Sequence, residues 1–354
     1  MAVTISAIQF HPVKKLLKQP FVTVLQQVEA RESTIVTLRD ADGFEGYGEC
    51  VAFDTPWYTE ETVVGSRYVM EKVLAPLLIG QPLSEPADAD SLFSSVKGNH
   101  MAKAGMEMAV WDLFSKREGM PLHQFVGGTS DTVPAGVVVA ANKNDIEKDI
   151  QQAVAHGYRR IKLKISPASD VALLENAVKS FPDTVFYADA NGSFSGRAQK
   201  ELMEFDRVGF SLIEQPYGEH EWHWHRDARK AMQTPICLDE SITCLEDVKH
   251  MVEQQAGDII VLKMGRLGGW TETLKVVDYC RQKQVGMWVG GMIEFGVSKA
   301  HNLALASLPE ITWTGDFSAS DHFWEKDIIT PDIRVEQGKI KLSMGVGIGY
   351  WLTL

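Results

Sequence analysis

Eight short, mainly apolar segments recur between residues 136 and 317 at an almost constant spacing. They span residues 136–140, 160–166, 185–191, 210–216, 235–241, 258–265, 286–292 and 311–317. Equivalent positions in successive segments lie 24 or 25 residues apart, as Val139, Lys164 and Asp189 illustrate. Strands that alternate with helical stretches at one pitch are typical of a parallel α/β barrel. An open, doubly wound sheet is the alternative, but eight near-identical units favour closure, and no G-x-G-x-x-G motif follows the first segment.

The residues outside this repeat have a mixed pattern. Strands are predicted at 3–10, 33–40 and 45–51, helices from Thr59 onward and over 99–116, and a last strand at 339–342. We expect an α+β capping domain over residues 1–125, a barrel over 126–325, and a C-terminal segment, 326–354, that returns to the cap.

Composition narrows the class of protein. Lys plus Arg is 35 and Asp plus Glu is 47, and the net charge of −12 argues against binding to nucleic acid or an anionic membrane. The N-terminus lacks the pattern of a signal peptide, and no apolar run approaches the roughly 20 residues of a membrane helix. The four sparse cysteines, Cys50, Cys237, Cys244 and Cys280, are expected to be reduced thiols. We predict a soluble, cytoplasmic protein whose partner is a small molecule; a homo-oligomer remains open.

Charged residues stand near the C-terminal ends of five successive predicted strands. They are Lys162, Lys164, Asp189, Glu214, Asp239 and Lys263. Charges are almost never fully buried without partners, and the C-terminal strand ends of a barrel form its active-site face. We therefore expect these side chains to face one cavity. Ordinary interstrand salt bridges are the alternative, but buried ion pairs rarely add net stability.

The three carboxylates, Asp189, Glu214 and Asp239, would repel one another unless a cation lay between them. Hard oxygen ligands without a nearby His or Cys favour Mg²⁺ or Mn²⁺. Lys164 and Lys263 are on strands that face each other across a barrel, which places one amine on each side of a bound substrate. A lysine beside another cation can act as a general base, and a divalent ion stabilises an enolate. The expected reaction class is abstraction of a proton alpha to the carboxylate of a small-molecule substrate.

These motifs resemble those of a known family. They are Lys162-Leu-Lys164, Asp189-Ala-Asn191, Ile213-Glu214-Gln-Pro216, Leu238-Asp239-Glu240-Ser241 and Lys263, supported by stretches at 56–61, 98–105, 290–294 and 318–321. The set is similar to that of the muconate-lactonizing branch of the enolase superfamily, and most resembles o-succinylbenzoate synthases related to N-acylamino acid racemases. The resemblance covers nearly the whole chain. It implies an α/β fold, a modified (β/α)7β TIM-type barrel with an α+β capping domain.

The resemblance also implies roles for the charged residues. The metal ligands, for Mg²⁺ or Mn²⁺, would be Asp189, Glu214 and Asp239. Lys164 would be the acid/base on one face, Lys263 its partner on the other, and Lys162 would neutralise the substrate carboxylate. The implied reaction is dehydration of 2-succinyl-6-hydroxy-2,4-cyclohexadiene-1-carboxylate to o-succinylbenzoate in menaquinone biosynthesis. N-acylamino acid racemisation is the close alternative; a Schiff-base aldolase and a non-catalytic binding barrel are more distant ones.

Four residues are expected to contact substrate. Asn191 shares a face with Asp189, and Ile293 lies in the motif at 290–294. Phe21, in the cap, and Phe323, after the last strand, could close over an apolar substrate, with core packing as an equal alternative.

Two residues beside the candidate site are expected to modulate it. Glu240 directly follows Asp239, and Arg266 lies three residues after Lys263. A guanidinium near Lys263 would disfavour its protonated amine and make it a better base, which would retain some racemase capacity. A surface arginine on a loop is the alternative for Arg266.

The chain departs from the family pattern after Glu294. The family commonly has a small residue there and Gly-Arg a little later, whereas this chain has Phe295 and then Ser298-Lys299. Phe295 would either narrow the substrate space or point into the helix layer.

Two weaker signals have simpler explanations. His220, His223 and His225 suggest zinc, but a loop or first helical turn is favoured because no fourth ligand is visible. The glycines at 265–269 resemble a phosphate cradle but are more typical of a turn.

Overall fold

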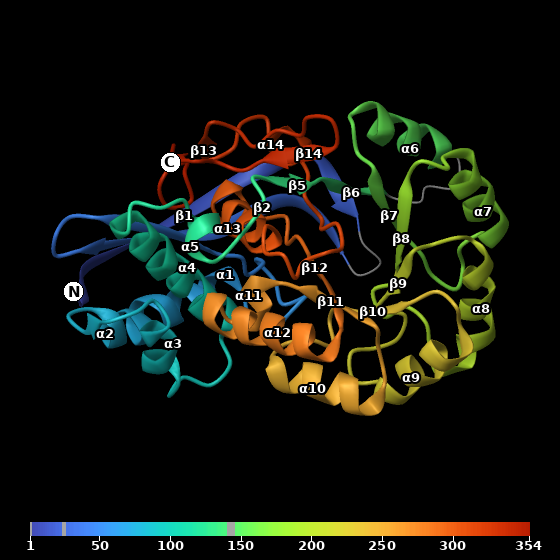
Figure 1. The fold of residues 1–354 in the computed structure, drawn as a ribbon, viewed down its shortest axis with the longest axis horizontal. Helices are drawn as coiled ribbons and strands as arrows, with labels where there is room; N and C mark the ends of the chain where they lie inside the picture. The colour runs from blue at the N-terminus through green and yellow to red at the C-terminus, as the bar shows by residue number, and fades with distance from the viewer. Residues whose placement is uncertain (1, 23–25, 140–145) are drawn as a thin grey trace.

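The computed structural model describes residues 2–22, 26–139 and 146–354 and contains two main sheets (Figure 1). One is a seven-stranded parallel sheet in the order β12-β11-β10-β9-β8-β7-β6. The other is a four-stranded antiparallel sheet in the order β3-β2-β1-β4, built from the N-terminal part of the chain. No helix in the described part of the chain is long and apolar enough to span a membrane.

The parallel sheet follows the predicted repeat. Its strands are β6 (Gly136–Val139), β7 (Arg160–Lys164), β8 (Val185–Asp189), β9 (Leu212–Glu214), β10 (Ile236–Leu238), β11 (Ile259–Leu262) and β12 (Gly286–Val289). The helices after them are α6 (Ile146–Ala155), α7 (Val171–Ser180), α8 (Gln199–Met203), α9 (Trp222–Ala231), α10 (Leu245–Gln254), α11 (Met264–Leu267), α12 (Trp270–Lys283) and α13 (Gly296–Ala306). Strand order equals chain order, so the sheet curls as predicted and the fold class is confirmed. Ala140, the end of the first predicted strand, lies outside the described residues.

The eighth predicted strand is wrong in detail. Residues 311–317 form no regular strand, although they lie between the two edges of the sheet. The Asp316 N–H donates to the Val289 carbonyl of β12 (3.0 Å), and the Gly136 N–H of β6 donates to the Phe317 carbonyl (3.2 Å). These isolated bonds bridge the gap without a continuous ladder, because the chain turns sharply there: the Phe317 N–H bonds back to the Gly315 carbonyl (3.1 Å).

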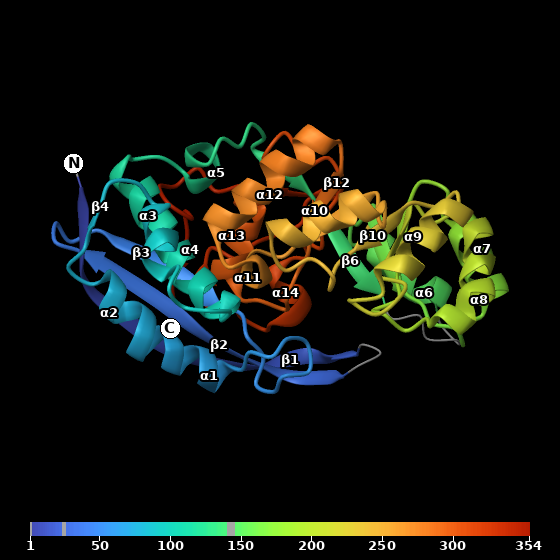
Figure 2. The same cartoon turned by 90° about the horizontal axis from the view of Figure 1, so that it is seen from below.

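The antiparallel sheet contains longer strands than the sequence predicts. They are β1 (Val3–Val22), β2 (Gln27–Asp40), β3 (Glu45–Cys50) and β4 (Pro82–Leu83). Figure 2 shows β1 and β2 as a long ribbon that extends beneath the barrel, where β1 approaches α14 (Ser320–Phe323). The sequence does not predict this extension, because most side chains in its outer half face solvent and no alternation of buried apolar residues marks it.

Helices cover one face of this sheet. They are α1 (Val63–Val69), a π-helical turn (Met70–Leu74), α2 (Ala75–Leu78), α3 (Asp88–Phe93), α4 (His100–Arg117) and α5 (Leu122–Phe125). The backbone of α4 approaches β3 closely at two glycines. A Cβ at Gly46 or Gly48 would lie 2.0 Å from the carbonyl oxygen of Ala109 or Gly105, respectively. Only glycine permits this contact, which fixes the end of β3 and the loop after it against the barrel.

The C-terminal segment contacts several parts of the chain. Strand β14 (Lys339–Lys341) pairs with β5 (Thr132–Pro134), and β15 (Trp351–Leu352) pairs with β13 (Ile329–Thr330). Gly347 forms an isolated bridge with Pro121. The division of the chain at residues 125 and 325 stays a prediction.

A buried carboxylate joins the N-terminal sheet to the helix that follows β12. Glu49 of β3 accepts hydrogen bonds from the N–H groups of Phe295 and Ser298, both 2.9 Å, at the N-terminus of α13. Burial raises the pKa of Glu49 to about 7, despite these two bonds and the nearby Arg31. The contact holds the loop before α13, which borders the candidate site, against the N-terminal sheet.

Candidate active site

The parallel strands bring the predicted charged residues together at one end of the sheet. Asp189 ends β8 and Glu214 ends β9, and the two are directly paired in the ladder. Asp239 follows β10, and Lys263 follows β11. Side chains two residues before these charges form a separate apolar cluster on the same face: Tyr187, Leu212, Cys237, Val261, together with Ile259 and Trp288. The charged residues therefore lie as one layer above an apolar floor inside the barrel.

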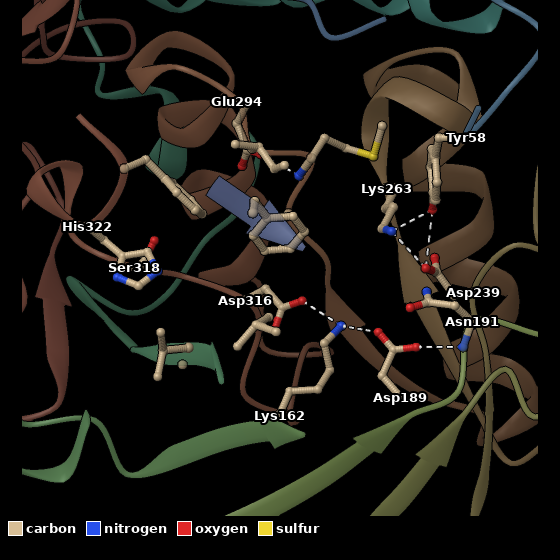
Figure 3. Close-up of a pocket in the computed structure, with 18 of the residues that line it drawn as sticks. Tyr58, Lys162, Asp189, Asn191, Asp239, Lys263, Glu294, Asp316, Ser318 and His322 are labelled. Carbon is tan, nitrogen blue, oxygen red and sulfur yellow. Dashed lines mark hydrogen bonds and ion pairs between the residues drawn. The ribbon is translucent and has the colours of Figure 1, made fainter. Parts of the chain in front are cut away.

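Lys162 is at the centre of this layer (Figure 3). Its side chain is 5 % exposed, and its ammonium lies 2.9 Å from Glu214, 3.2 Å from Asp189 and 2.8 Å from Asp316. Burial alone would lower the pKa of Lys162, but the three carboxylates outweigh burial and hold that pKa well above its ordinary value. Lys162 is therefore a permanent cation in this structure.

Lys164 lies two residues further along β7, on the same face. Its ammonium donates hydrogen bonds to Asp189 Oδ2 and Asn191 Oδ1, both 2.6 Å. The Asn191 amide in turn donates to Glu240 Oε1 (3.0 Å), whereas Glu240 Oε2 is buried without a hydrogen-bond partner among the described residues. Burial, reinforced by Asp239 and Asp189, raises the pKa of Glu240 to about 7.

Lys263 approaches from the opposite side of the layer, beside Asp239 (Figure 3). Its ammonium lies 2.7 Å from Asp239 Oδ2, and Arg266 Nη2 lies 2.7 Å from Asp239 Oδ1. Both cations also donate hydrogen bonds of 2.6 Å to the Tyr58 hydroxyl, and that hydroxyl donates to Asp239 Oδ2 (3.2 Å). Arg266 is 4 % exposed, so it is not the surface residue of the alternative interpretation.

The carboxylates differ in their charge balance. Burial opposes ionisation of all three, but Lys164 and Lys162 lower the pKa of Asp189, and Arg266 and Lys263 lower that of Asp239. Glu214 has the opposite balance, because burial and repulsion from Asp189 outweigh Lys162 and raise its pKa well above the usual value. The single neighbouring cation, Lys162, therefore does not offset burial and the nearby carboxylates at Glu214.

The donor set fits a hard divalent cation. Three buried carboxylates come from neighbouring strand ends, and one further carboxylate oxygen, of Glu240, has no partner among the described residues. The side chains do not enclose an ion in their present positions, since no three His, Cys, Asp or Glu groups of the described chain converge on one point. The ammonium groups of the lysines occupy the space between the carboxylates instead.

A cavity of about 860 Å³, measured out to its open mouth, borders this layer. Lys162, Lys164, Lys263, Asp189, Asn191 and Asp239 line one part of it. Phe21, Ile293 and Phe323 also line it, so with Asn191 the structure brings all four predicted substrate contacts to one cavity. Lys299 lines the cavity as well. Phe21 and Phe323 meet edge to face, with ring centroids 6.2 Å apart, which joins the N-terminal sheet to α14 across the cavity wall.

Phe295 points away from this cavity. It is fully buried and stacks on Trp324, with ring centroids 4.5 Å apart. Of the two alternatives for Phe295, the packed one is right, and the residue does not narrow the substrate space.

The histidines at 220–225 lie where the favoured interpretation places them, in the loop after β9 and the first turn of α9. His220 is 88 % exposed, whereas His225 is buried in α9 and accepts a hydrogen bond from the Tyr217 N–H (3.2 Å). The glycines at 265–269 form the end of α11 and the turn before α12, as the simpler explanation predicts.

Sequence reasoning did not place two residues, Asp316 and Tyr58, in the charged layer. Asp316 binds both Lys162 (2.8 Å) and Arg160 (2.6 Å). It lies in the eighth repeat, so the rule that singled out the other strand ends would have found it. Tyr58 comes from the loop after β3, and nothing in the sequence places that loop beside Lys263.

Comparison with known proteins identifies the family. Residues 145–353 match the family described as enolase C-terminal domain-like, and residues 4–127 match the mandelate racemase/muconate lactonizing enzyme N-terminal domain. The chain belongs to the enolase superfamily. Enzymes of this superfamily generally use a divalent metal ion.

Enolase superfamily relatives align with almost the entire chain. An o-succinylbenzoate synthase of Geobacillus kaustophilus is 40 % identical over 352 residues, which cover 99 % of this chain and 94 % of the relative. An N-succinylamino acid racemase of Thermus thermophilus is 39 % identical, with 91 % of this chain and 88 % of the relative covered. A solved structure of an enolase superfamily member from Listeria innocua superposes with a TM-score of 0.96 at 36 % identity, covering 99 % and 95 % of the two chains.

Proposed function

We propose that this chain dehydrates 2-succinyl-6-hydroxy-2,4-cyclohexadiene-1-carboxylate to o-succinylbenzoate, a step of menaquinone biosynthesis in the cytoplasm. The observation that carries the proposal is the pair of lysines on opposite sides of one carboxylate layer, Lys164 beside Asp189 and Lys263 beside Asp239, both 2.7 Å or less from their partners. The curated synthases at about 40 % identity support this choice of substrate.

Asp189, Glu214 and Asp239 would hold the metal ion, Mg²⁺ or Mn²⁺. A divalent ion bound there would supply positive charge to stabilise the enediolate that forms when the alpha proton leaves. Glu240 and Asn191 are proposed to hold the ligand carboxylates in place. The Asn191 amide donates to Glu240, which directly follows Asp239, and so links the Asp239 and Lys164 sides of the layer.

Lys164 acts as the general base and then as the general acid. Its neutral amine accepts the proton from the carbon alpha to the substrate carboxylate. The resulting ammonium returns that proton to the hydroxyl group as the carbon–oxygen bond breaks, so the leaving group departs as water. Lys162, a buried cation, neutralises the substrate carboxylate, and Lys263 contributes a second positive charge on the opposite face.

Racemisation of N-succinylamino acids is a second proposed activity. One lysine would remove the alpha proton and the lysine on the other face would return a proton, which inverts the carbon. The Arg266 guanidinium supports this activity, because it shares Asp239 with Lys263 and so places a second cation beside that amine. A racemase at 39 % identity supports it as well.

The proposal is tested by assaying the purified protein with Mg²⁺ or Mn²⁺. The cyclohexadiene substrate should be converted to o-succinylbenzoate, and the Lys164→Ala variant should not convert it. Absence of turnover by the wild-type protein with metal present would overturn the synthase assignment. N-succinyl and N-acetyl amino acids, assayed in parallel for loss of optical rotation, test the second activity.

A further inference from the structure

Lys299 differs from the other lysines that line the cavity. Lys162, Lys164 and Lys263 each lie within 3.2 Å of a carboxylate oxygen. Lys299 is only 2 % exposed, yet it has no carboxylate within 4 Å in the described part of the chain. A buried ammonium without a counter-ion is costly, and lysine is almost never fully buried unpaired.

The contacts of the Lys299 ammonium leave most of its donor capacity unused. It donates one hydrogen bond, to the Ser318 carbonyl oxygen (3.2 Å), and lies 5.6 Å from the centre of the Phe323 ring. An ammonium has three N–H donors, and a ring at this distance offsets its charge only weakly. The remaining donors belong to a residue that lines the cavity, so a ligand there can reach them.

Lys299 lies at the other end of the cavity from Lys263. Its acceptor, Ser318, is two residues after Asp316, the partner of Lys162. Two residues span at most about 7 Å, so Lys299 borders the same cavity on the Asp316 side. Figure 3 shows Ser318 on the side of the cavity away from Lys263 and Asp239. The cavity thus has two cationic ends, one made of the paired lysines and one made of Lys299.

We propose that Lys299 binds a second anionic group of the substrate, the terminal carboxylate of a succinyl chain, and that it makes the site selective for dicarboxylates. The inference rests on the proposed function, which places the reacting carboxylate at the Lys162–Lys164 end. Both proposed substrates carry a succinyl chain, and its carboxylate is the counter-ion that no described residue supplies to Lys299. Phe21 and Phe323 provide an apolar wall for the methylene groups between the two ends.

The test compares ligands that differ only in the terminal carboxylate. Binding of o-succinylbenzoate and of 2-butanoylbenzoate is measured by calorimetry with the wild-type protein and with Lys299→Met, Lys299→Arg and Lys179→Met. Lys179 is an exposed lysine on α7 that pairs with Glu175, so its variant controls for a general loss of positive charge. The kcat/KM ratio for N-succinyl over N-acetyl amino acids provides a second measurement.

In the wild-type protein we expect o-succinylbenzoate to bind 10- to 100-fold more tightly than the analogue, as for a charge-assisted hydrogen bond. Lys299→Met should remove most of this preference and raise KM for the N-succinyl substrate. Lys299→Arg should restore part of it, and Lys179→Met should not change it. The same preference in Lys299→Met as in the wild type would overturn the inference. Because binding is measured without turnover, that result is distinct from a failure of the proposed reaction, which would leave the wild-type protein inactive.

Discussion

The Lys263 ammonium donates a 2.6 Å hydrogen bond to the hydroxyl of Tyr58, a residue of the loop after β3. The lysine proposed as the partner of Lys164 on the opposite face is thereby in contact with the N-terminal part of the chain. Burial raises the pKa of Tyr58 well above its ordinary value, so the phenol stays neutral and can donate to Asp239. Tyr58 and Arg266 together hold Lys263 in one orientation.

Replacing Arg266 by Gln should impair the two faces of the site unequally. The change removes the cation that shares Asp239 with Lys263. A neighbouring positive charge favours a neutral amine, so its loss should weaken the base on the Lys263 face. We expect proton exchange on the Lys263 face of an N-succinylamino acid to fall at least 10-fold more than exchange on the Lys164 face. Exchange into D₂O, followed by NMR for each enantiomer, measures this difference.

Arg281→Gln is the matched control, because Arg281 is 58 % exposed on α12, pairs with Asp278 and lies outside the candidate site. It should leave both exchange rates near the wild-type values. Equal losses on the two faces in Arg266→Gln would contradict the idea that Arg266 acts through Lys263.

The lysines should separate the two proposed activities. Lys164→Ala removes the base that serves both reactions, so dehydration and racemisation should each fall by about 1,000-fold or more. Lys263→Ala should abolish racemisation but leave exchange of the alpha proton on the Lys164 face. If Lys263→Ala still interconverted the enantiomers, a single-base mechanism would have to replace the proposed pair.

Much of this site follows from the sequence because parallel strands impose their register on the side chains. Asp189 and Glu214 are neighbours in the ladder, so their spacing of 25 residues becomes a spatial contact. The family and the fold class could be predicted because the pitch and the strand-end motifs extend through the whole barrel, and both predictions are confirmed.

The remaining contacts depend on packing between distant segments. The approach of Tyr58 to Lys263 requires β3 to lie against α4, and this is set by the absence of side chains at Gly46 and Gly48. That no described residue supplies a counter-ion to Lys299 is a property of its surroundings, and no local pattern of the sequence reveals it.

Metal removal should affect stability as well as activity. Dialysis against a chelator should abolish turnover, and Mg²⁺ or Mn²⁺ should restore it. Because the ion would bind only the native arrangement of Asp189, Glu214 and Asp239, metal at 100 times its Kd should raise the free energy of unfolding by about 2.7 kcal/mol. Thermal unfolding with and without metal measures the shift.

Glu214→Gln is the variant that tests this assignment. It should lose the metal-dependent stabilisation while remaining folded, since burial already raises the pKa of Glu214. A full metal-dependent shift in Glu214→Gln would remove this residue from the ligand set.

Acidification should destabilise the protein through His301. This histidine is buried; it accepts a hydrogen bond from the Trp270 indole N–H at Nδ1 (3.0 Å), and Nε2 lies 2.9 Å from the Tyr47 carbonyl oxygen. Burial lowers the pKa of His301 to about 4, so between about pH 4 and 6.5 the unfolded chain binds the extra proton and the folded chain does not. The stabilisation is therefore present above pH 6.5 and is lost as the pH falls toward 4.

From pH 7 to pH 5 the wild-type protein should lose about 2 kcal/mol more of its free energy of unfolding than His301→Gln, as measured by urea unfolding at both values. His220→Gln, at an 88 % exposed position, should lose as much as the wild type, whereas identical losses in wild type and His301→Gln would show that His301 is not the group that titrates.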